Sequence, residues 1–115
     1  MASSPLDNYL RTHRRRLGLS QEDVAFLLGV KSGETTSRHE KFARVPSLET
    51  ALAYEAILKQ PLSELFAGLY HKIERKVVER ARVLNERPKR GKPPPARRRQ
   101  TLSEIAITHS KHSQK

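Results

Sequence analysis

Residues 17–30 read LGLSQEDVAFLLGV, a short amphipathic helix with a start signal and a stop signal. Ser20 has the side chain favoured at a helix N-cap, and Asp23, three residues later, completes an acidic variant of the capping box. Gly29 ends the helix because glycine adopts the left-handed backbone conformation at little cost. Between these signals, one helical face carries four apolar side chains: Val24, Ala25, Leu27 and Leu28.

Four more segments have helical periodicity and flank this helix on both sides. We expect them at about residues 6–17, 33–41, 47–60 and 62–86. The last segment carries a long stripe of apolar residues at spacings of three or four. Gly68 lies inside it and costs about 1 kcal/mol relative to alanine in a helix interior, so we expect a break or a bend there.

The composition favours an all-α protein and excludes several kinds of site. Hydrophobic residues make up 36% of the 115, enough for a modest core, and glycine is scarce. Cysteine is absent, so disulfides, thiolate nucleophiles and cysteine-based zinc sites are excluded. No apolar run approaches the roughly 20 residues that span a bilayer, and residues 1–16 lack an apolar signal-peptide core. We therefore expect a soluble, cytoplasmic protein.

Positive charge is concentrated at the C-terminal end of the sequence. Residues 1–86 hold 14 Lys and Arg against 11 Asp and Glu, whereas residues 87–115 hold 9 against 1. Such a tail favours a polyanionic partner, and nucleic acid is preferred over a membrane because no Trp-, Phe- or Leu-rich amphipathic face accompanies the charge. A purely solubilising tail is the alternative. Four prolines and a glycine interrupt residues 87–100, so we expect disorder from residue 87, with at most a short helix at about residues 101–108.

Several local motifs occur in an order that is typical of one family. They are LRTHRRRLGLSQEDVAFLLGV at residues 10–30, SGETTSRHE at residues 32–40, PSLETALAYEAIL at residues 46–58 and PLSELF at residues 61–66. Together they resemble the bacterial-type Xre/Cro/lambda-repressor family of helix-turn-helix transcriptional regulators. The resemblance covers about residues 6–67, a little over half of the chain.

The resemblance implies an all-α fold in which five helices form a lambda-repressor-like DNA-binding domain. We expect this domain at residues 1–67, then an extended last helix at residues 68–86 and the disordered basic tail at residues 87–115. The apolar stripe of the extension either packs back on the domain or pairs with a partner helix. Because members of the family commonly bind two half-sites as dimers, we expect a homodimer.

The resemblance also assigns the helix at residues 33–41 to the major groove of double-stranded DNA, which is wide enough for one α-helix. Arg38 can engage a guanine edge with two hydrogen bonds, or it grips a phosphate instead. Glu34 can accept from a cytosine amino group, although the helix dipole alone also favours an acid in the first turn. The positions that match base-reading residues of the family are Gly33, Glu34, Ser37 and Arg38.

Other positions match contacts to the DNA backbone or contacts within the domain. Gln21 matches a position that bonds a phosphate with help from the helix dipole, although it is also an ordinary helix-start residue. Arg14 and Glu40 match an ion pair that ties the first helix to the third. Phosphate contact is further expected from three flanking cations, which are otherwise simply solvated: Lys31, Lys41 and Arg44.

The sequence departs from the family pattern in two respects. One extra residue in the turn before Ser37 makes the register of Gly33 and Glu34 ambiguous by one position. Gly33 has no side chain and permits only a close approach of the backbone. In addition, Thr36 and His39 stand where relatives bury aliphatic side chains, and a polar atom buried there needs a hydrogen-bond partner.

Residues 90–93 read RGKP and resemble the Arg-Gly-Arg-Pro core of an AT-hook, which lies in an A·T-rich minor groove. Lysine replaces the second arginine of that motif, and unspecific attraction to phosphate is the alternative role of the tail. The tail residues expected to contact DNA are Arg90, Lys92, Arg97, Arg98 and Arg99.

These features favour a sequence-specific DNA-binding protein that regulates transcription and is nucleoid-associated when bound. We expect a repressor, because no activation or catalytic module is visible. The alternative is an antitoxin or adaptor whose basic tail and last helix bind a protein partner, with autoregulatory DNA binding. An enzyme is disfavoured because the five histidines are scattered and no nucleophile, phosphate-loop or paired-carboxylate motif occurs. No cofactor, metal site or small-molecule ligand is predicted.

Overall fold

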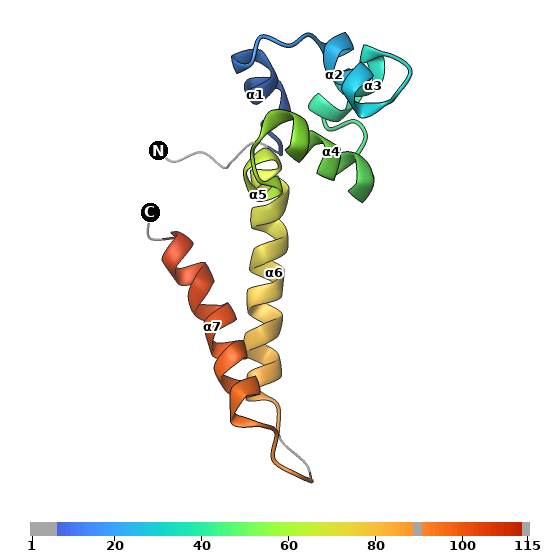
Figure 1. Cartoon of the computed structure of the whole chain (residues 1–115). Helices are drawn as coiled ribbons and strands as arrows, with labels where there is room; N and C mark the ends of the chain where they lie inside the picture. Colours follow the sequence, from blue (N-terminus) through green and yellow to red (C-terminus); the bar gives the residue numbers. More distant parts are fainter. Residues whose placement is uncertain (1–6, 89–90, 114–115) are drawn as a thin grey trace. The chain divides into compact units, whose positions relative to one another are not determined.

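The structure is a computed structural model that describes residues 7–88 and 91–113, with side chains as far as residue 107. Every regular element in this part of the chain is a helix, which confirms the expected all-α class (Figure 1). The chain divides into two compact units, residues 1–70 and 71–115. The helices are α1 (Leu10–Arg16), α2 (Gln21–Leu28), α3 (Gly33–Glu40), α4 (Leu48–Leu58), α5 (Leu62–Leu65), α6 (Ala67–Glu86) and α7 (Ala96–Ser113).

The capping signals of α2 act as the sequence predicts. Ser20 Oγ accepts a hydrogen bond from the Asp23 backbone N–H, and Asp23 Oδ2 accepts one from the Ser20 backbone N–H, both at 2.9 Å. Gly29 closes the helix in the left-handed conformation, with φ of 80°. α3 and α4 begin in the same manner, because the hydroxyls of Ser32 and Ser47 accept from backbone N–H groups of the first turn.

The first helix begins later than the sequence predicts, at Leu10 instead of about residue 6. The side chain of Asn8 accounts for this start. Its Oδ1 accepts from the Leu10 backbone N–H at 3.2 Å, and its Nδ2 donates to the carbonyl of His39 at 2.9 Å. Asn8 therefore links the first residue of α1 to the end of α3. Residues 1–6 lie outside the described part of the chain.

The core of the first unit is small and joins residues from helices that are distant in sequence. Tyr54 and Leu58 of α4 meet Leu10 of α1 and Val24 of α2, and Leu65 and Phe66 complete the cluster. The Tyr9 backbone N–H also donates to the Leu65 carbonyl at 2.7 Å, which fixes the entry to α1 against α5. Because α3 is mostly polar, its place depends on the helices that this core holds together.

The expected interruption of the last helical stripe occurs two residues before Gly68. α5 ends at Leu65, Phe66 takes a non-helical conformation with φ of −119° and ψ of 46°, and α6 begins at Ala67. Phe66 is 8% exposed because its ring belongs to the core. Burial of this ring redirects the chain at Phe66, and Gly68 is an ordinary buried residue inside α6.

The second unit corrects the expected disorder of the tail from residue 87, and the helix in the tail is longer than the short one expected at about residues 101–108. Residues 96–113 form α7, which lies antiparallel to α6 as a helical hairpin (Figure 1). Ala81 of α6 is 5% exposed, Leu102 and Ile105 of α7 are half-buried, and Asn85 Nδ2 donates to Ser103 Oγ at 3.4 Å. All the prolines of the tail precede Ala96, so none interrupts this helix.

None of the helices in the described residues is both long enough and apolar enough to cross a membrane.

Replacing Ser20 with alanine removes one half of the α2 capping box. We expect Ser20→Ala to lower the free energy of unfolding by about 1 kcal/mol, because one backbone N–H of the first turn loses its acceptor. Urea denaturation followed by circular dichroism measures the change. Ser63→Ala is the matched control, since this exposed serine caps no helix, and an equal loss in both variants would contradict a capping role.

Candidate nucleic-acid interface

The outward face of α3 is polar, as the sequence predicts. Glu34 and Arg38 are exposed, and Ser37 is half-buried. Thr36 and His39 point inward and are buried. A helix of eight residues thus presents short and charged side chains on one side while its opposite side is held by the rest of the unit.

Gly33 lies at the contact between α2 and α3, and this corrects its expected place among the base-reading residues. Its backbone N–H donates to Glu22 Oε2 at 2.7 Å, and the residue is buried. A Cβ atom at this position would lie 3.1 Å from the Glu22 backbone nitrogen. The close approach that glycine permits here is to α2.

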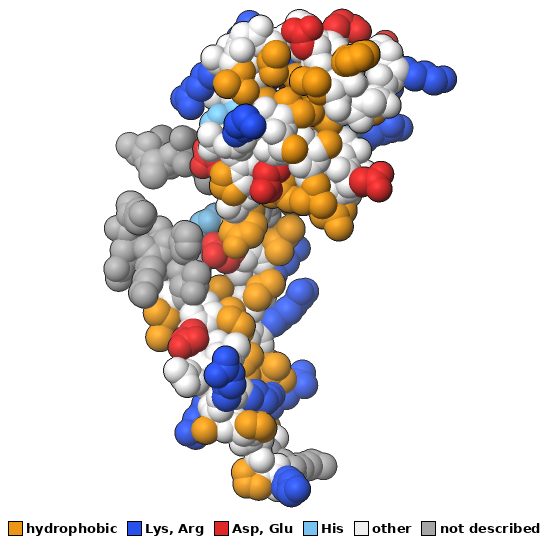
Figure 2. Space-filling model, viewed as in Figure 1, with side chains coloured by type: hydrophobic (Ala, Val, Ile, Leu, Met, Phe, Trp, Pro, Cys, Tyr) orange, Lys and Arg blue, Asp and Glu red, His pale blue; other side chains and the backbone are white. Residues whose placement is uncertain are grey.

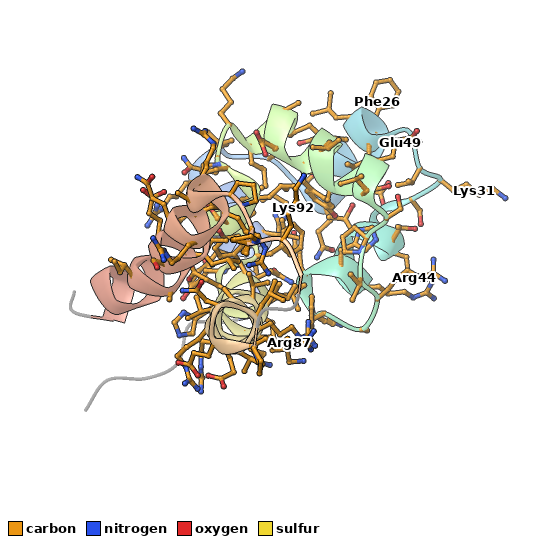
Figure 3. All side chains as sticks on the ribbon, turned by 90° about the horizontal axis from the view of Figure 1, so that it is seen from below. Phe26, Lys31, Arg44, Glu49, Arg87 and Lys92 are labelled. Carbon is orange, nitrogen blue, oxygen red and sulfur yellow. The ribbon has the colours of Figure 1, made fainter. Side chains whose placement is uncertain are left out.

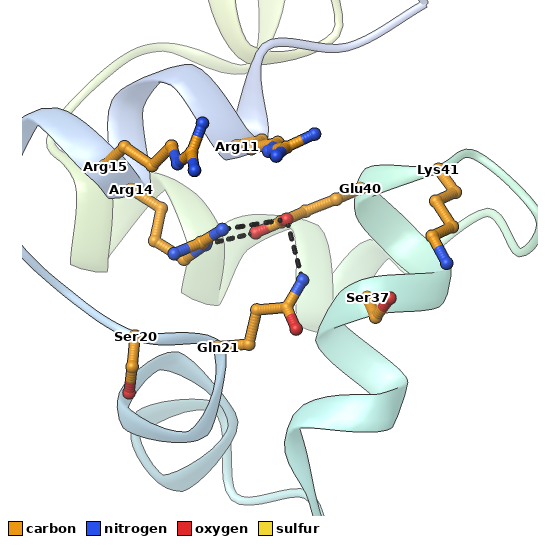
Figure 4. A pocket seen from close by; sticks show the side chains of 8 residues that line it. All are labelled: Arg11, Arg14, Arg15, Ser20, Gln21, Ser37, Glu40 and Lys41. Atoms are coloured by element: carbon orange, nitrogen blue, oxygen red, sulfur yellow. Dashed lines mark hydrogen bonds and ion pairs between the residues drawn. The ribbon is translucent and has the colours of Figure 1, made fainter.

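Arg14 and Glu40 form the expected ion pair. Arg14 Nε donates to Glu40 Oε2 at 2.5 Å and Nη2 donates to Oε1 at 3.2 Å, while Nη1 donates to the Leu19 carbonyl at 2.8 Å. Gln21 Nε2 donates to the same Glu40 carboxylate at 3.1 Å. The carboxylate side chain is only 4% exposed, so loss of one partner would leave a poorly solvated charge. This network joins α1, the start of α2 and the end of α3 (Figure 4).

A cavity of about 550 Å³ opens between these three helices. Because the charge of Arg14 is offset by Glu40, the cations that remain are Arg11 and Arg15 of α1 and Lys41 after α3. All three are exposed, and hydroxyl and amide groups stand beside them. Its lining residues, drawn in Figure 4, are Arg11, Arg14, Arg15, Ser20, Gln21, Ser37, Glu40 and Lys41. We refer to this cavity as the cationic groove; its chemistry suits an anion that carries several oxygen acceptors.

Arg11 and Arg15 are not among the DNA contacts predicted from the sequence, although their spacing of four residues places them on one face of α1. The sequence alone contains four arginines in residues 11–16, and spacing does not show which of them face α3. Arg16, for instance, is exposed but does not line the groove.

The remaining predicted contacts lie at different places around α3. Arg38 Nη2 donates to Glu34 Oε1 at 2.8 Å. This exposed pair, four residues apart on one helix, contributes about 0.3–0.5 kcal/mol to stability, so a stronger partner of Arg38 can replace Glu34. Lys31 and Arg44 lie on the loops before and after α3 and extend into solvent (Figure 3). Phe42, with φ of 57°, is in the left-handed region and packs against the core, which anchors the loop that carries Arg44.

The predicted tail contacts fall in the second unit. Lys92 is exposed in the connection before α7, and Arg97, Arg98 and Arg99 occupy the first turn of that helix. Arg97 and Arg99 are exposed, whereas Arg98 is half-buried. Arg90 lies outside the described residues, so the structure does not describe the RGKP motif as a whole.

The polar residues on the inner face of α3 meet a tyrosine of α4. His39 Nδ1 and the Tyr54 hydroxyl are 2.8 Å apart, and the two rings meet edge to face. Burial lowers the pKa of His39, and the charge of Arg44 acts in the same direction. Burial also raises the pKa of Tyr54, to which the charge of Glu40 contributes. Both rings are therefore neutral near pH 7 and serve the packing of α3.

No protein-family model, no curated protein and no solved structure matches this chain. The described residues bring no three His, Asp or Glu side chains together as a metal site would require. The cationic groove beside the polar face of α3 is the arrangement with the clearest chemistry in the first unit.

The hydroxyl of Thr36 gives a test of packing beneath α3. Thr36 is fully buried and its hydroxyl makes no hydrogen bond of good geometry, although it lies close enough to the Tyr54 phenol to lower the pKa of that group. An unpartnered buried hydroxyl costs about 1–3 kcal/mol. We therefore expect Thr36→Val, which keeps the shape of the side chain, to raise the free energy of unfolding by about 1–2 kcal/mol in urea denaturation.

Thr35→Val is the matched control for this measurement, because Thr35 is the neighbouring, half-exposed threonine of the same helix. We expect it to change stability by less than about 0.5 kcal/mol. A loss of stability in Thr36→Val would instead mean that the hydroxyl bonds Tyr54 in solution.

Proposed function

We propose that this chain is a sequence-specific double-stranded DNA-binding protein of the helix-turn-helix type, and that it regulates transcription. The observation that supports this most strongly is the cationic groove directly beside the outward polar face of α3. A phosphate backbone seated in the groove would bring α3 to the base edges of the adjacent major groove, which is about 12 Å wide. The proposal includes a lambda-repressor-like arrangement of α1 to α5 and membership of the Xre/Cro family.

In this proposal the two kinds of contact come from different residues. Arg11, Arg15 and Lys41 neutralise phosphates. The Gln21 amide, which donates one hydrogen to Glu40, adds its second hydrogen at the start of α2, where the helix dipole also attracts an anion. Lys31 and Arg44 reach phosphates on either side of α3. Base edges are read by Ser37, Arg38 and Glu34, after Arg38 exchanges its exposed partner Glu34 for a guanine.

We further propose that the protein acts as a repressor and binds as a homodimer. Occupation of a promoter site by a bound protein is sufficient for repression. Ile73 and Val77 of α6 are 50% and 44% exposed, so part of the long apolar stripe remains accessible to a second copy. Two copies would read two half-sites about one helical turn apart.

A second candidate function is an antitoxin or adaptor that binds a protein partner. It is favoured by large apolar side chains that remain exposed on α2 and α4. Phe26 is 83% exposed and Leu48 is 71% exposed, and Leu27 and Leu52 are also exposed on the same two helices. Figure 2 shows apolar side chains over much of the visible face of the first unit. Such side chains are typical of surfaces that bind other proteins.

Selection of bound sequences from a random duplex library at near-physiological salt tests the proposed function. We expect the full chain to enrich an inverted repeat with half-sites about one helical turn apart. Arg38→Ala should cost about 1–3 kcal/mol on the selected site and relax the preference at one base pair, because a bidentate contact to a base is lost. The absence of any enriched sequence would contradict the proposal and favour the protein-binding candidate.

Neutralising the groove gives a second readout in the same system. Replacing both Arg11 and Arg15 with glutamine should weaken binding to all sequences alike, and should reduce the slope of log K against log salt by about 0.9 for each lost phosphate contact. Arg16→Gln on the same helix is the matched control and should leave the slope unchanged. Equal effects of the groove and control substitutions would show that the groove holds no phosphate.

A further inference from the structure

Most of the positive charge of the chain belongs to the second unit. Residues 71–115 contain 14 of the 23 Lys and Arg residues but only 4 of the 12 Asp and Glu residues, a net charge of +10. Five of these cations lie on α6 and three lie at the start of α7. The charge is therefore carried by a folded helical hairpin and not only by the connection between its helices.

The outward face of α6 collects these cations. Ala81, Val78 and Asn85 are buried or half-buried toward the seam with α7. With 3.6 residues per turn, Arg75, Lys76 and Arg80 fall away from that seam, and all three are exposed. Figure 2 shows blue side chains along this unit.

A hollow of about 610 Å³ extends from this face to Val78 at the edge of the seam, and most of its lining is cationic. Its one acidic lining residue, Glu79, is held by Arg82, whose Nη2 donates to the two carboxylate oxygens at 2.8 and 2.6 Å. Arg75, Lys76 and Arg80 form no ion pair within the described residues. The hollow is lined by Lys72, Arg75, Lys76, Val78, Glu79 and Arg80.

The start of α7 adds a second concentration of charge. Its first turn contains Arg97, Arg98 and Arg99 and no acidic residue. A helix dipole disfavours cations at this end of a helix. An anionic partner would relieve the mutual repulsion of the arginines.

We propose that the α6–α7 hairpin is a second DNA-binding surface, which contacts duplex phosphates without reading sequence. Arg75, Lys76 and Arg80 of α6, with Arg97 and Arg99 of α7, make these contacts. Regularly placed cations on a rigid helix complement a duplex that carries one negative charge per roughly 1.7 Å of its axis. The choice of duplex DNA as the polyanion rests on the function proposed for the first unit.

The chemistry of the hairpin favours nucleic acid over a lipid surface. Helices that lie on membranes insert Trp, Phe or several Leu side chains beside their cations. Residues 71–86 contain no Trp or Phe, and their one leucine, Leu84, is half-buried. The face is therefore suited to phosphates that stand in solvent, as those of a duplex do.

The test uses the full chain and a random-sequence 30-base-pair duplex, with binding measured over a range of salt concentrations. Replacing Arg75, Lys76 and Arg80 together with glutamine should reduce the slope of log K against log salt by about 0.9 per lost contact, or about 2.7 for all three. The matched control, Arg75→Lys with Lys76→Arg and Arg80→Lys, keeps the charge and should keep the slope. Circular dichroism of both variants verifies that α6 remains helical, as expected from the good helix propensity of Gln, Lys and Arg.

The outcomes separate this proposal from the one made for the first unit. An unchanged slope in the glutamine variant, with its helicity intact, would overturn the hairpin surface even if the library still yields a sequence motif. A reduced slope without any enriched motif would support the hairpin while the sequence-specific function fails. Binding of the same glutamine variant to vesicles of phosphatidylserine and phosphatidylcholine is measured beside duplex binding. If the variant loses vesicle binding that the unchanged chain shows, while its duplex binding is unchanged, the proposal is overturned in favour of a membrane surface.

Discussion

The bidentate pairing of Arg14 with Glu40 sets the arrangement on which the first unit depends. α3 is too polar to hold its place through apolar burial, since its buried residues are Gly33, Thr36 and His39. The ion pair fixes the end of α3 to α1, and Gln21 extends the network to the start of α2. Because the Glu40 carboxylate is almost fully buried, this attachment is costly to break from either side.

One consequence of this attachment is the separation of structural from accessible charge. Arg14 forms an ion pair with Glu40, whereas Arg11 and Arg15 on the same helix remain exposed along the groove. Burial keeps His39 and Tyr54 neutral beneath α3, so these two side chains add no charge to that of the Arg14–Glu40 pair. A polar helix bordered by cations is the arrangement that phosphate positioning and base contact together require. The same division holds in the hairpin, where Arg82 is paired with Glu79 and Glu86. The cations Arg75, Lys76 and Arg80 of the same helix are exposed to solvent.

Short-range signals in the sequence predict the bounds of single helices, whereas features that depend on packing between distant residues are not predicted from it. Ser20, Asp23 and Gly29 act within one or two helical turns, so the bounds of α2 followed from them directly. The break between α5 and α6 at Phe66 depends on the burial of its ring among α1, α2 and α4, and no signal in the neighbouring sequence predicts it. The groove depends on which arginines of α1 face α3, a property of the folded arrangement. For the tail, the sequence predicts at most a short helix at about residues 101–108, and α7 is longer because all the prolines of the tail precede it.

In the function proposed here, duplex DNA lies along α3 and the cationic groove. This placement can be measured by titrating a library-selected duplex into ¹⁵N-labelled full-length protein and following the backbone amide chemical shifts. We expect the largest shift changes in residues 33–41, in the first turn of α2 and around Arg11 and Arg15, with further changes along α6. Amides of residues 33–41 that do not shift when the duplex is saturated, while others do, would contradict it.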